Sequence, residues 1–598
     1  MIDTAKYCPE YLLSEIPEIF EIARQYNDIE EFRKKAAEYV HKMQYETFND
    51  FSSFSEGKII RVRDCGWVIN QILTCRAEEK AQFSVAQALL DIARNVPRED
   101  LSPSFYAEIL HLFLGLNGKG PRPKFADYHL MPSQMEGREA AIERSIQLDT
   151  LSEDMEKYMS KYSDGLAISS IERRQRRRDH ILKVLNSSLS DWYDWRWQYK
   201  NIMREPDKIK QLVTLTPEQA DSLDISRSIK IPFGITPYYL SLMDDKPESG
   251  RDWAIRAQVL PPLSYTEQLS EFDKRDRSCL DFMRETDTSP IDLITRRYPS
   301  ICIFKPFNTC PQICVYCQRN WEIEDAMMPG AMASDKQIND ALQWIKEHPA
   351  IHEVLITGGD PLGMNDDDVE RIVAGVAGIP SVERIRIGTR TLVTAPMRIT
   401  DRLVNILSKY IESGKRQMAV VTHIQHPYEL TPDTAEAVAK LKNSSISVFN
   451  QLVYTFFISR RFEAAYLRKN LSRIGVEPYY SFNTKGKEET LEYRVPIARL
   501  LQEQKEEARL LPGLSRTDEA VYNVPGMGKN YLRARQHHDL ISILADGTRL
   551  YEFHPWEKNI TRGISTHIGQ DIPILDYLAR LEAAGEDIDD YETIWYYF

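Results

Sequence analysis

The chain has 598 residues, with 76 Lys and Arg against 89 Asp and Glu, which gives a formal net charge of −13. Hydrophobic residues make up 42% of it and charged residues 28%, the composition of a globular protein with ample material for a core. No apolar run approaches the roughly 20 residues of a membrane span, and the acidic balance argues against nucleic-acid binding along the whole chain. Eight cysteines cannot form a disulfide scaffold in so long a chain. We therefore expect a cytoplasmic protein with reduced thiols and several structural units.

Residues 1–170 are predicted to form a helical accessory region without a recognisable chemical motif. Segments 28–43 and 83–94 place apolar residues three and four positions apart, as amphipathic helices do. Residues 171–290 form a second helical region that leads into the core and begins with five arginines within residues 171–180. This basic run suggests a nucleic-acid contact, but one basic turn is far short of a phosphate-binding surface, so a solvated or partner-facing helix is favoured.

Residues 291–490 alternate short apolar runs with helical patterns. Ser334 and Thr400 are suitable helix N-caps, and Thr431 is followed by Pro432, which favours a first helical position. Strands separated by helices in this way are joined by crossovers and lie parallel, so we predict an α/β sheet or barrel with ligands at the carboxyl ends of the strands. The predicted strands cover residues 300–304, 352–356, 382–387, 418–423, 446–452 and 477–482.

Residues 491–598 are less regular. They contain the glycine-rich stretch VPGMGKN, a predicted hairpin over residues 540–553 that turns at Asp546 and Gly547, and a final amphipathic helix near residues 572–584.

Cys310, Cys314 and Cys317 form a CxxxCxxC motif just after the first predicted strand. Three thiolates are one too few for a closed tetrahedral zinc site. A [4Fe–4S] cluster on three cysteines instead leaves one iron open for a further ligand. Zinc completed by a histidine, and cysteines of the core without a metal, are the alternatives.

This motif resembles that of the radical S-adenosylmethionine enzymes. The resemblance implies that the open iron binds S-adenosylmethionine and that reduction cleaves it to a 5′-deoxyadenosyl radical. Gly358, Gly359 and Asp360 follow at the end of the second strand. A glycine pair lets a ligand approach the backbone, and the carboxylate can orient an ammonium, although an ordinary turn would explain the three residues equally well.

Residues 192–554 more specifically resemble the lysine 2,3-aminomutase family, through DWRWQ, ITPYYLSL, DTSPIDLITRRYP, RIGTRT, APMRIT, THIQHP, NQLV, EPYYSF and VPGMGK in this order. The resemblance implies a partial (β/α)6 radical SAM barrel and pyridoxal phosphate as a second cofactor. In this family the amino group of an amino acid moves between the α and β carbons. The resemblance also implies a flavodoxin- or ferredoxin-type electron donor and a homo-oligomer.

The resemblance assigns the Schiff-base lysine to Lys529, although a surface-loop lysine is the commoner fate of such a residue. The stretch is not a Walker A loop, because Asn523 stands where that motif has its first glycine. Further cofactor contacts implied by the family are Arg297, Tyr298 and Arg398 for the phosphate or ring of pyridoxal phosphate, and Tyr316, His423 and Gln451 for the nucleoside of S-adenosylmethionine.

The family resemblance assigns Arg319 to the substrate α-carboxylate, which a guanidinium binds well. Lysine 2,3-aminomutases place two aspartates around the substrate ammonium, and Lys485 and Asn523 occupy those positions here. Because Lys485 would repel a buried substrate ammonium and pair with a carboxylate, the pattern resembles the glutamate 2,3-aminomutase branch. We predict conversion of L-glutamate to β-glutamate. The alternatives are another amino acid, lysine included, and a non-catalytic Fe–S or zinc protein that binds nucleic acid through the basic run.

The metal content tests one departure from the family. The lysine enzymes end in a cysteine-rich zinc site, whereas no cysteine follows Cys317 in this chain. Anaerobically purified protein should therefore contain iron and no structural zinc. Zinc at one equivalent per chain in elemental analysis would contradict this prediction.

Overall fold

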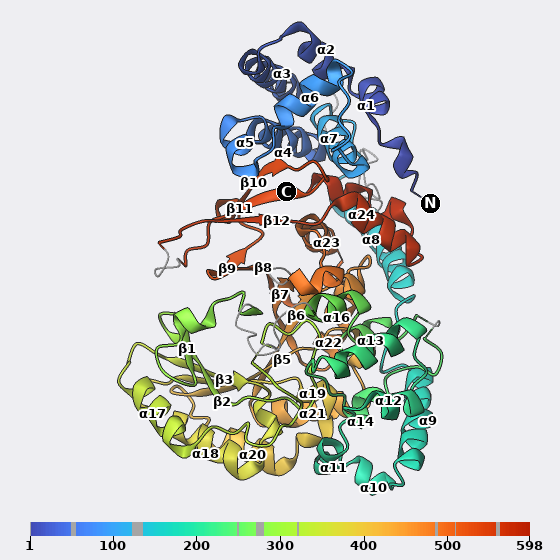
Figure 1. The fold of residues 1–598 in the computed structure, drawn as a ribbon. Helices are drawn as coiled ribbons and strands as arrows, with labels where there is room; N and C mark the ends of the chain where they lie inside the picture. The colour runs from blue at the N-terminus through green and yellow to red at the C-terminus, as the bar shows by residue number, and fades with distance from the viewer. Residues whose placement is uncertain are drawn as a thin grey trace.

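The computed structural model describes residues 2–49, 56–121, 135–247, 250–270, 280–319, 322–484, 488–508, 510–557 and 563–598. A large curved sheet with its helices forms one end of the molecule, and the N-terminal helices cover a small sheet at the other end (Figure 1).

The large sheet has nine strands whose spatial order follows the chain. β2 to β8 are parallel to their neighbours, and β1 and β9 run antiparallel at the two edges. The strands are β1 (Ile294–Tyr298), β2 (Ile301–Phe307), β3 (Glu353–Gly358), β4 (Arg384–Gly388), β5 (Gln417–Thr422), β6 (Ser447–Tyr454), β7 (Glu477–Asn483), β8 (Glu519–Val524) and β9 (Gly528–Tyr531).

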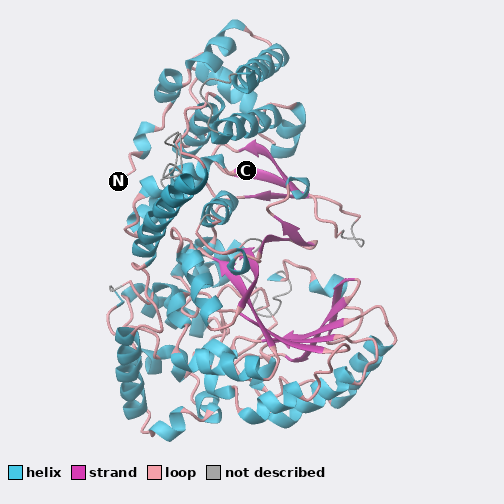
Figure 2. Cartoon of the chain, turned by 180° about the vertical axis from the view of Figure 1, so that it is seen from behind, coloured by secondary structure: helices cyan, strands magenta, loops and turns pink. Residues whose placement is uncertain are grey.

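Crossover helices lie on the outer side of the curved sheet (Figure 2). Ser334, Thr400 and Thr431 cap three of them through backbone N–H groups, as predicted. The predicted α/β fold is confirmed, and β8 adds a seventh parallel strand to the six expected. The helices are α17 (Asp335–Lys346), α18 (Asp366–Ala377), α19 (Thr391–Thr394), α20 (Asp401–Ser408), α21 (Pro432–Asn443), α22 (Glu463–Arg473) and α23 (Ile497–Glu507).

The two edges of the large sheet meet. The backbone N–H of Lys529 on β9 donates to the Tyr298 hydroxyl on β1 at 3.4 Å. The N–H of Gly526, in the turn before β9, donates to the carbonyl of Phe282 upstream of β1 at 2.9 Å. Curvature thus brings the first and last strands together and nearly closes the barrel.

The N-terminal helices pack on a second, three-stranded sheet of β10 (His538–Ile543), β11 (Arg549–Phe553) and β12 (His567–Gln570). α4 and α5 contact β10, and α7 contacts the terminal helices α24 (Ile574–Ala583) and η12 (Ile588–Tyr596). The predicted hairpin and final helix are confirmed. The N-terminal helices are α1 (Pro9–Glu15), α2 (Pro17–Gln25), α3 (Ile29–Asn49), α4 (Glu56–Ile72), α5 (Cys75–Ala81), α6 (Val85–Ala93) and α7 (Pro103–Leu116).

The basic run lies in α9 and is turned partly inward. Arg174 is buried and donates to the carbonyl of Gly165 at 2.7 Å, while buried Arg177 pairs with Asp245. Arg173 also donates to the Tyr428 hydroxyl at 2.9 Å, so three of the five arginines bind within the fold, which weakens the nucleic-acid alternative. The helices of this middle region are α8 (Gly137–Met159), α9 (Ile168–Val184), α10 (Leu189–Trp192), α11 (Trp195–Lys200), α12 (Pro206–Leu212), α13 (Pro217–Ser228), α14 (Pro237–Leu240), α15 (Trp253–Ala257) and α16 (Leu263–Ser270). Among the helices that the structure describes, none is both long and apolar enough to cross a membrane.

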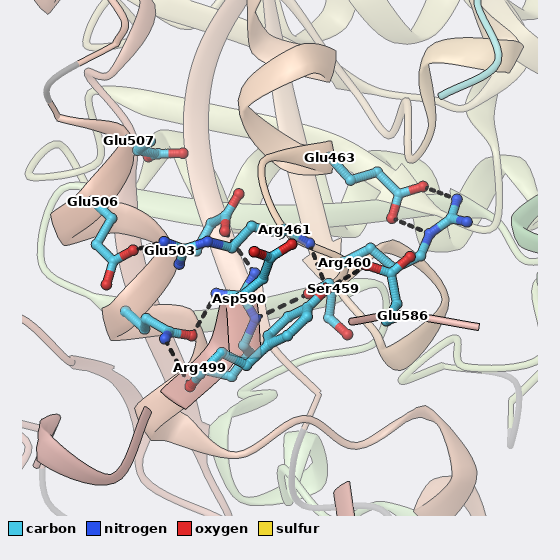
Figure 3. Close-up of polar contacts among 12 residues, drawn as sticks. Ser459, Arg460, Arg461, Glu463, Arg499, Glu503, Glu506, Glu507, Glu586 and Asp590 are labelled. Atoms are coloured by element: carbon cyan, nitrogen blue, oxygen red, sulfur yellow. Dashed lines mark hydrogen bonds and ion pairs between the residues drawn. The ribbon is translucent and has the colours of Figure 1, made fainter. Parts of the chain in front are cut away.

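A buried network of arginine and glutamate side chains joins α22, α23 and the end of the chain (Figure 3). Arg499 and Glu503 form an ion pair at 2.6 Å, and Arg461 pairs with Glu506. Thr593 of η12 donates to Glu506 at 2.7 Å. Buried charges of this kind are tolerated only when paired, so the network fixes how the terminal segment docks on the barrel helices.

A second buried ion pair, between Arg549 of β11 and Glu108 of α7 at 3.0 Å, joins the small sheet to the N-terminal helices. Removing one partner leaves an uncompensated buried charge, at a cost of about 3–5 kcal/mol. Arg549→Met should therefore lower stability strongly in urea unfolding. The control Lys336→Met, in an exposed pair with Asp340 at 2.6 Å, should change it by less than about 1 kcal/mol. Equal losses for the two variants would contradict the prediction.

Candidate active site

The three motif cysteines lie in the loop that follows β2, at the carboxyl end of the sheet, as predicted. The N–H of Ile313 in this loop donates to the carbonyl of Gly234 at 3.2 Å, which ties the loop to the helical region before the barrel. Burial raises the pKa of the Cys310 and Cys314 thiols. The neighbouring Cys317 adds to this effect at both thiols.

Three closely spaced thiols are a donor set that an iron–sulfur cluster takes. Among the described residues, no three His, Cys, Asp or Glu side chains are arranged to hold one metal ion. A [4Fe–4S] cluster binds each cysteine through a different iron, so its ligands need not converge on a point. Thiolate ligation would also remove the cost of ionising buried thiols.

Arg390, just beyond β4, joins the cysteine loop to its surroundings. Its Nη1 donates to Cys314 Sγ at 2.7 Å, and its Nη2 donates to Glu429 at 2.7 Å and to Gln258. Its Nε donates to the carbonyl of His423 at 3.3 Å. This residue occurs in the quoted RIGTRT motif, yet its central position could not be assigned from the sequence, because its partners, which include Tyr239, are spread over 190 residues.

Gly358, Gly359 and Asp360 hold the cysteine loop against the end of β3. A Cβ on Gly359 would lie 2.0 Å from the Thr309 carbonyl oxygen, so a glycine is required for this close approach. The Asp360 carboxylate accepts hydrogen bonds from Thr389 Oγ1 at 2.7 Å and from the N–H of Arg390 at 2.9 Å. In this structure Asp360 therefore clamps β3 to β4, and its carboxylate is already occupied rather than open to an ammonium.

The residues predicted to line the nucleoside lie around the same loop. The Tyr316 hydroxyl donates to Gln258 at 3.0 Å, His423 follows β5, and Gln451 lies on β6. Burial, together with the charge of Arg390, lowers the pKa of His423 to about 4. The imidazole is therefore neutral at neutral pH and can accept or donate a hydrogen bond without adding charge.

Arg319 lies in a buried group of four charges. Its Nη1 is 2.8 Å from Glu285, and its Nη2 pairs with Glu322. Lys305 lies 3.5 Å from Glu285 and 3.4 Å from Glu322. The group is neutral overall, and the Arg319 Nε is buried without a hydrogen-bond partner in the described chain. A substrate carboxylate at Arg319 would thus compete with two internal carboxylates.

Lys529 lies on β9 directly opposite Asn523 of β8. Directly opposed residues of an antiparallel pair project to the same face, so these two side chains share one side of the hairpin. The Lys529 Nζ lies 4.8 Å from the ring centre of Tyr298 and 5.3 Å from that of Tyr480. Burial, then the charge of Arg386, lowers the pKa of Lys529 to about 8.

Arg297 of β1 and Glu557 flank this lysine. Their charged groups are 4.0 Å apart, and the Arg297 Nη1 is buried without a hydrogen-bond partner in the described chain. Burial raises the pKa of Glu557 to about 7, and Arg297 and Lys529 oppose that effect. Glu557 was not found from the sequence, because no motif marks it and only the fold brings it to β9.

Two predicted residues stand apart from this group. Arg398 is fully buried, and its guanidinium donates to the carbonyls of Leu362 at 3.0 Å and Met364 at 3.0 Å and pairs with Asp366 at 2.7 Å. These partners occupy it in holding the loop after β3. Lys485 lies outside the described residues.

The model of the Radical SAM superfamily matches residues 304–453, which contain the cysteine loop and β3 to β5. An uncharacterized KamA family protein of Methanocaldococcus jannaschii is 40% identical over 98% of this chain and 97% of its own length. The chain belongs to the KamA family. The Radical SAM match implies a [4Fe–4S] cluster and S-adenosylmethionine, for which the three cysteines and the strand ends around them supply a fitting set of donors.

Two kinds of KamA relative carry a named activity. Glutamate 2,3-aminomutase of Clostridioides difficile is 34% identical over 60% of this chain and 80% of its own length. L-lysine 2,3-aminomutase of Bacillus subtilis is 35% identical over 52% of this chain and 62% of its own length. Aminomutases are isomerases, so these relatives imply that this member of the KamA family is an isomerase. The remainder of the chain lies outside both alignments.

The glycine beside Lys529 offers a test of this part of the site. Gly528 has φ +90°, and a Cβ there would lie 1.7 Å from Glu557 Oε2. Gly528→Ala should therefore reduce stability in urea unfolding by more than the about 1–2 kcal/mol of a left-handed alanine alone. Gly330→Ala is the matched control, since Gly330 has φ +82° and no neighbour within 4 Å of its Cβ position. Equal losses would show that Glu557 does not pack on Gly528.

Proposed function

We propose that the protein is a pyridoxal phosphate-dependent 2,3-aminomutase that moves the amino group of L-glutamate from C2 to C3. The observation that carries the proposal is the β8–β9 register, which sets Asn523 beside Lys529. Lysine 2,3-aminomutases have an aspartate at the position that corresponds to Asn523. An amide there can donate a hydrogen bond to a substrate carboxylate and offers no charge to a substrate ammonium.

Lys529 is suited to form a Schiff base. With a pKa of about 8, roughly a tenth of its amine is unprotonated at pH 7, against about four parts in ten thousand for an ordinary lysine. Pyridoxal phosphate, when bound there, would hold the substrate amino group and allow it to migrate between neighbouring carbons. The Arg297 Nη1, which has no hydrogen-bond partner among the described residues, and the ring of Tyr298 would bind its phosphate and ring.

The distal substrate carboxylate is assigned to Lys485 and Asn523, and the α-carboxylate to Arg319. A buried substrate ammonium placed between Lys485 and Asn523 would face the like charge of Lys485, at a cost of several kcal/mol. A substrate carboxylate in the same place would pair with Lys485. Because Glu285 and Glu322 already neutralise Arg319, binding of the α-carboxylate involves loosening one of those pairs.

A cluster with S-adenosylmethionine, when bound by Cys310, Cys314 and Cys317, would supply radical chemistry, and the chain's part is to hold the reacting groups in place. Arg390 and Asp360 fix the cysteine loop to the strand ends. His423, Tyr316 and Gln451 are assigned to the nucleoside. We further propose an electron donor of the flavodoxin or ferredoxin type, a homo-oligomer, and a cytoplasmic location, where such a cluster stays reduced.

The proposal predicts the product of an anaerobic incubation with pyridoxal phosphate, S-adenosylmethionine, a reductant and one of L-glutamate, L-lysine or L-aspartate. β-Glutamate should form from glutamate, and no β-lysine should form from lysine. Lys529→Ala should abolish turnover. The double variant Lys485→Asp with Asn523→Asp should lose glutamate turnover, whereas Lys415→Asp, at an exposed lysine before β5, should keep it.

β-Lysine without β-glutamate would overturn the substrate assignment. Full glutamate turnover by the double variant would overturn the assignment of Lys485 and Asn523 to the substrate carboxylate.

A further inference from the structure

Arg390 lies just beyond β4, and its side chain contacts a sulfur atom of the cysteine motif. The Nη1 of Arg390 donates to Cys314 Sγ at 2.7 Å, and the residue is only 9% exposed. Cys314 is one of the three cysteines assigned to the iron–sulfur cluster. The fold therefore holds a cationic hydrogen-bond donor against a cluster thiol, in a place where little water screens its charge.

The guanidinium of Arg390 is held on its other sides as well. Its Nη2 donates to Glu429 Oε1 at 2.7 Å and to the Tyr239 hydroxyl at 3.2 Å. Its Nε donates to the His423 carbonyl at 3.3 Å, and the backbone N–H of the same residue donates to Asp360 at 2.9 Å. These partners come from three separate segments of the chain, so the fold fixes the direction in which Nη1 points.

Glu429 is the counter-charge of Arg390, and it is fully buried. Its Oε1 also accepts hydrogen bonds from the Tyr239 hydroxyl at 2.7 Å and from Gln258 Nε2 at 2.9 Å. Its Oε2 accepts from the N–H of Gln425 at 2.6 Å. Because these groups hold the carboxylate in place, Glu429 anchors one side of the guanidinium and leaves Nη1 directed at the sulfur.

We propose that the hydrogen bond from Arg390 to Cys314 raises the reduction potential of the iron–sulfur cluster, and that Glu429 positions the guanidinium for it. Reduction adds one electron from an external reductant, and the ligand sulfurs share the added negative charge. A cationic donor at one of these sulfurs stabilises the reduced state more than the oxidised state, and hydrogen bonds to the sulfurs are among the factors that set such potentials. No bond of Arg390 is made or broken in this step.

A second hydrogen bond to a motif sulfur shows why Arg390 is the residue to test. The backbone N–H of Arg319 donates to Cys317 Sγ at 3.4 Å. That bond is longer, and a side-chain substitution leaves its donor in place, whereas the Arg390 donor belongs to a side chain that can be exchanged. The proposal rests on the cluster that the Radical SAM match implies, and it goes beyond the proposed function, because neither the amino acid nor pyridoxal phosphate takes part.

The test removes the donor without leaving a buried charge unpaired. Arg390→Met alone would leave Glu429 as an uncompensated buried carboxylate, which strongly destabilises a fold. Glu429→Gln is therefore the reference, and the double variant Arg390→Met with Glu429→Gln is compared with it. Arg384→Gln is the matched control, because Arg384 starts the same strand, β4, and its half-exposed side chain pairs with Glu353 at 3.1 Å.

The measurement uses the full-length protein, reconstituted anaerobically with iron and sulfide and without S-adenosylmethionine or an amino acid. Iron analysis gives the cluster content, and electron paramagnetic resonance of the reduced cluster during a dithionite titration with mediator dyes gives the potential. At one fixed ambient potential, the ratio of reduced to oxidised cluster should be about tenfold lower in the double variant than in Glu429→Gln, a shift of about 59 mV for one electron. Arg384→Gln should keep the wild-type potential.

A further variant, Arg390→Lys, separates the hydrogen bond from the charge. Lysine keeps the positive charge, but its ammonium is a point charge and lacks the planar fork that binds the sulfur and Glu429 together. The potential of Arg390→Lys should therefore lie below that of the wild type. A potential equal to the wild-type value would show that the charge alone is responsible and would overturn the assignment to the hydrogen bond.

An equal or higher potential in the double variant than in Glu429→Gln, at equal iron content, would overturn the proposal. A double variant that folds but assembles no cluster would overturn it too, since Arg390 would then serve assembly rather than the potential. Absence of a cluster in the reconstituted wild type would overturn the proposal together with the cluster assignment. A wrong amino-acid substrate leaves all these results unaffected, so failure of the proposed function is distinguishable from failure of this inference.

Discussion

Closure of the large sheet is the constraint on which the rest of the site depends. Nine strands in chain order would form an open sheet with distant edges, but curvature brings β1 against β9, where the Lys529 N–H meets the Tyr298 hydroxyl at 3.4 Å. The cysteine loop follows β2, next to the same seam. One hydrogen-bonded sheet thus carries the ligands of the iron–sulfur cluster and the buried lysine, and their relative position is set by strand register rather than by a flexible linker.

Buried charge is distributed unevenly around this sheet. Near the helices, arginines and glutamates pair with one another, as Arg499 does with Glu503 (Figure 3). At the seam Arg297 and Glu557 are 4.0 Å apart, and within the described part of the chain each keeps one buried polar atom without a hydrogen-bond partner. The network of Figure 3 also keeps buried polar atoms without a hydrogen-bond partner in the described chain, among them Arg461 Nε and Nη1 and Glu503 Oε1. The two regions therefore differ in the distance between the paired charges, 2.6 Å for Arg499 and Glu503 against 4.0 Å for Arg297 and Glu557.

The sequence predicted what is local and left out what is assembled over long distances. Ser334, Thr400 and Thr431 cap helices through neighbouring backbone groups, so a few residues of sequence suffice to find them. The cysteine loop and Lys529 were found through motifs. Asp360 proved to be a strand clamp and Arg398 a loop support, since their partners are chosen by tertiary packing. Arg390 and Glu557 are positioned by contacts between segments far apart in the chain. A short stretch of sequence does not contain both partners of such a contact.

The packing of the N-terminal helices on the small sheet affects how the chain folds during synthesis. Glu108 and Arg549 are 441 residues apart, and Arg535 after β9 pairs with Asp64 of α4 at 2.5 Å. At about 5–20 residues per second, the first helices leave the ribosome about 20 to 90 seconds before the strands that cover them. All five residues of β11 are buried. The N-terminal helices and the small sheet therefore cannot pack on each other until translation is nearly complete. The molecule therefore depends on its earliest segment staying free of aggregation until the last hundred residues arrive.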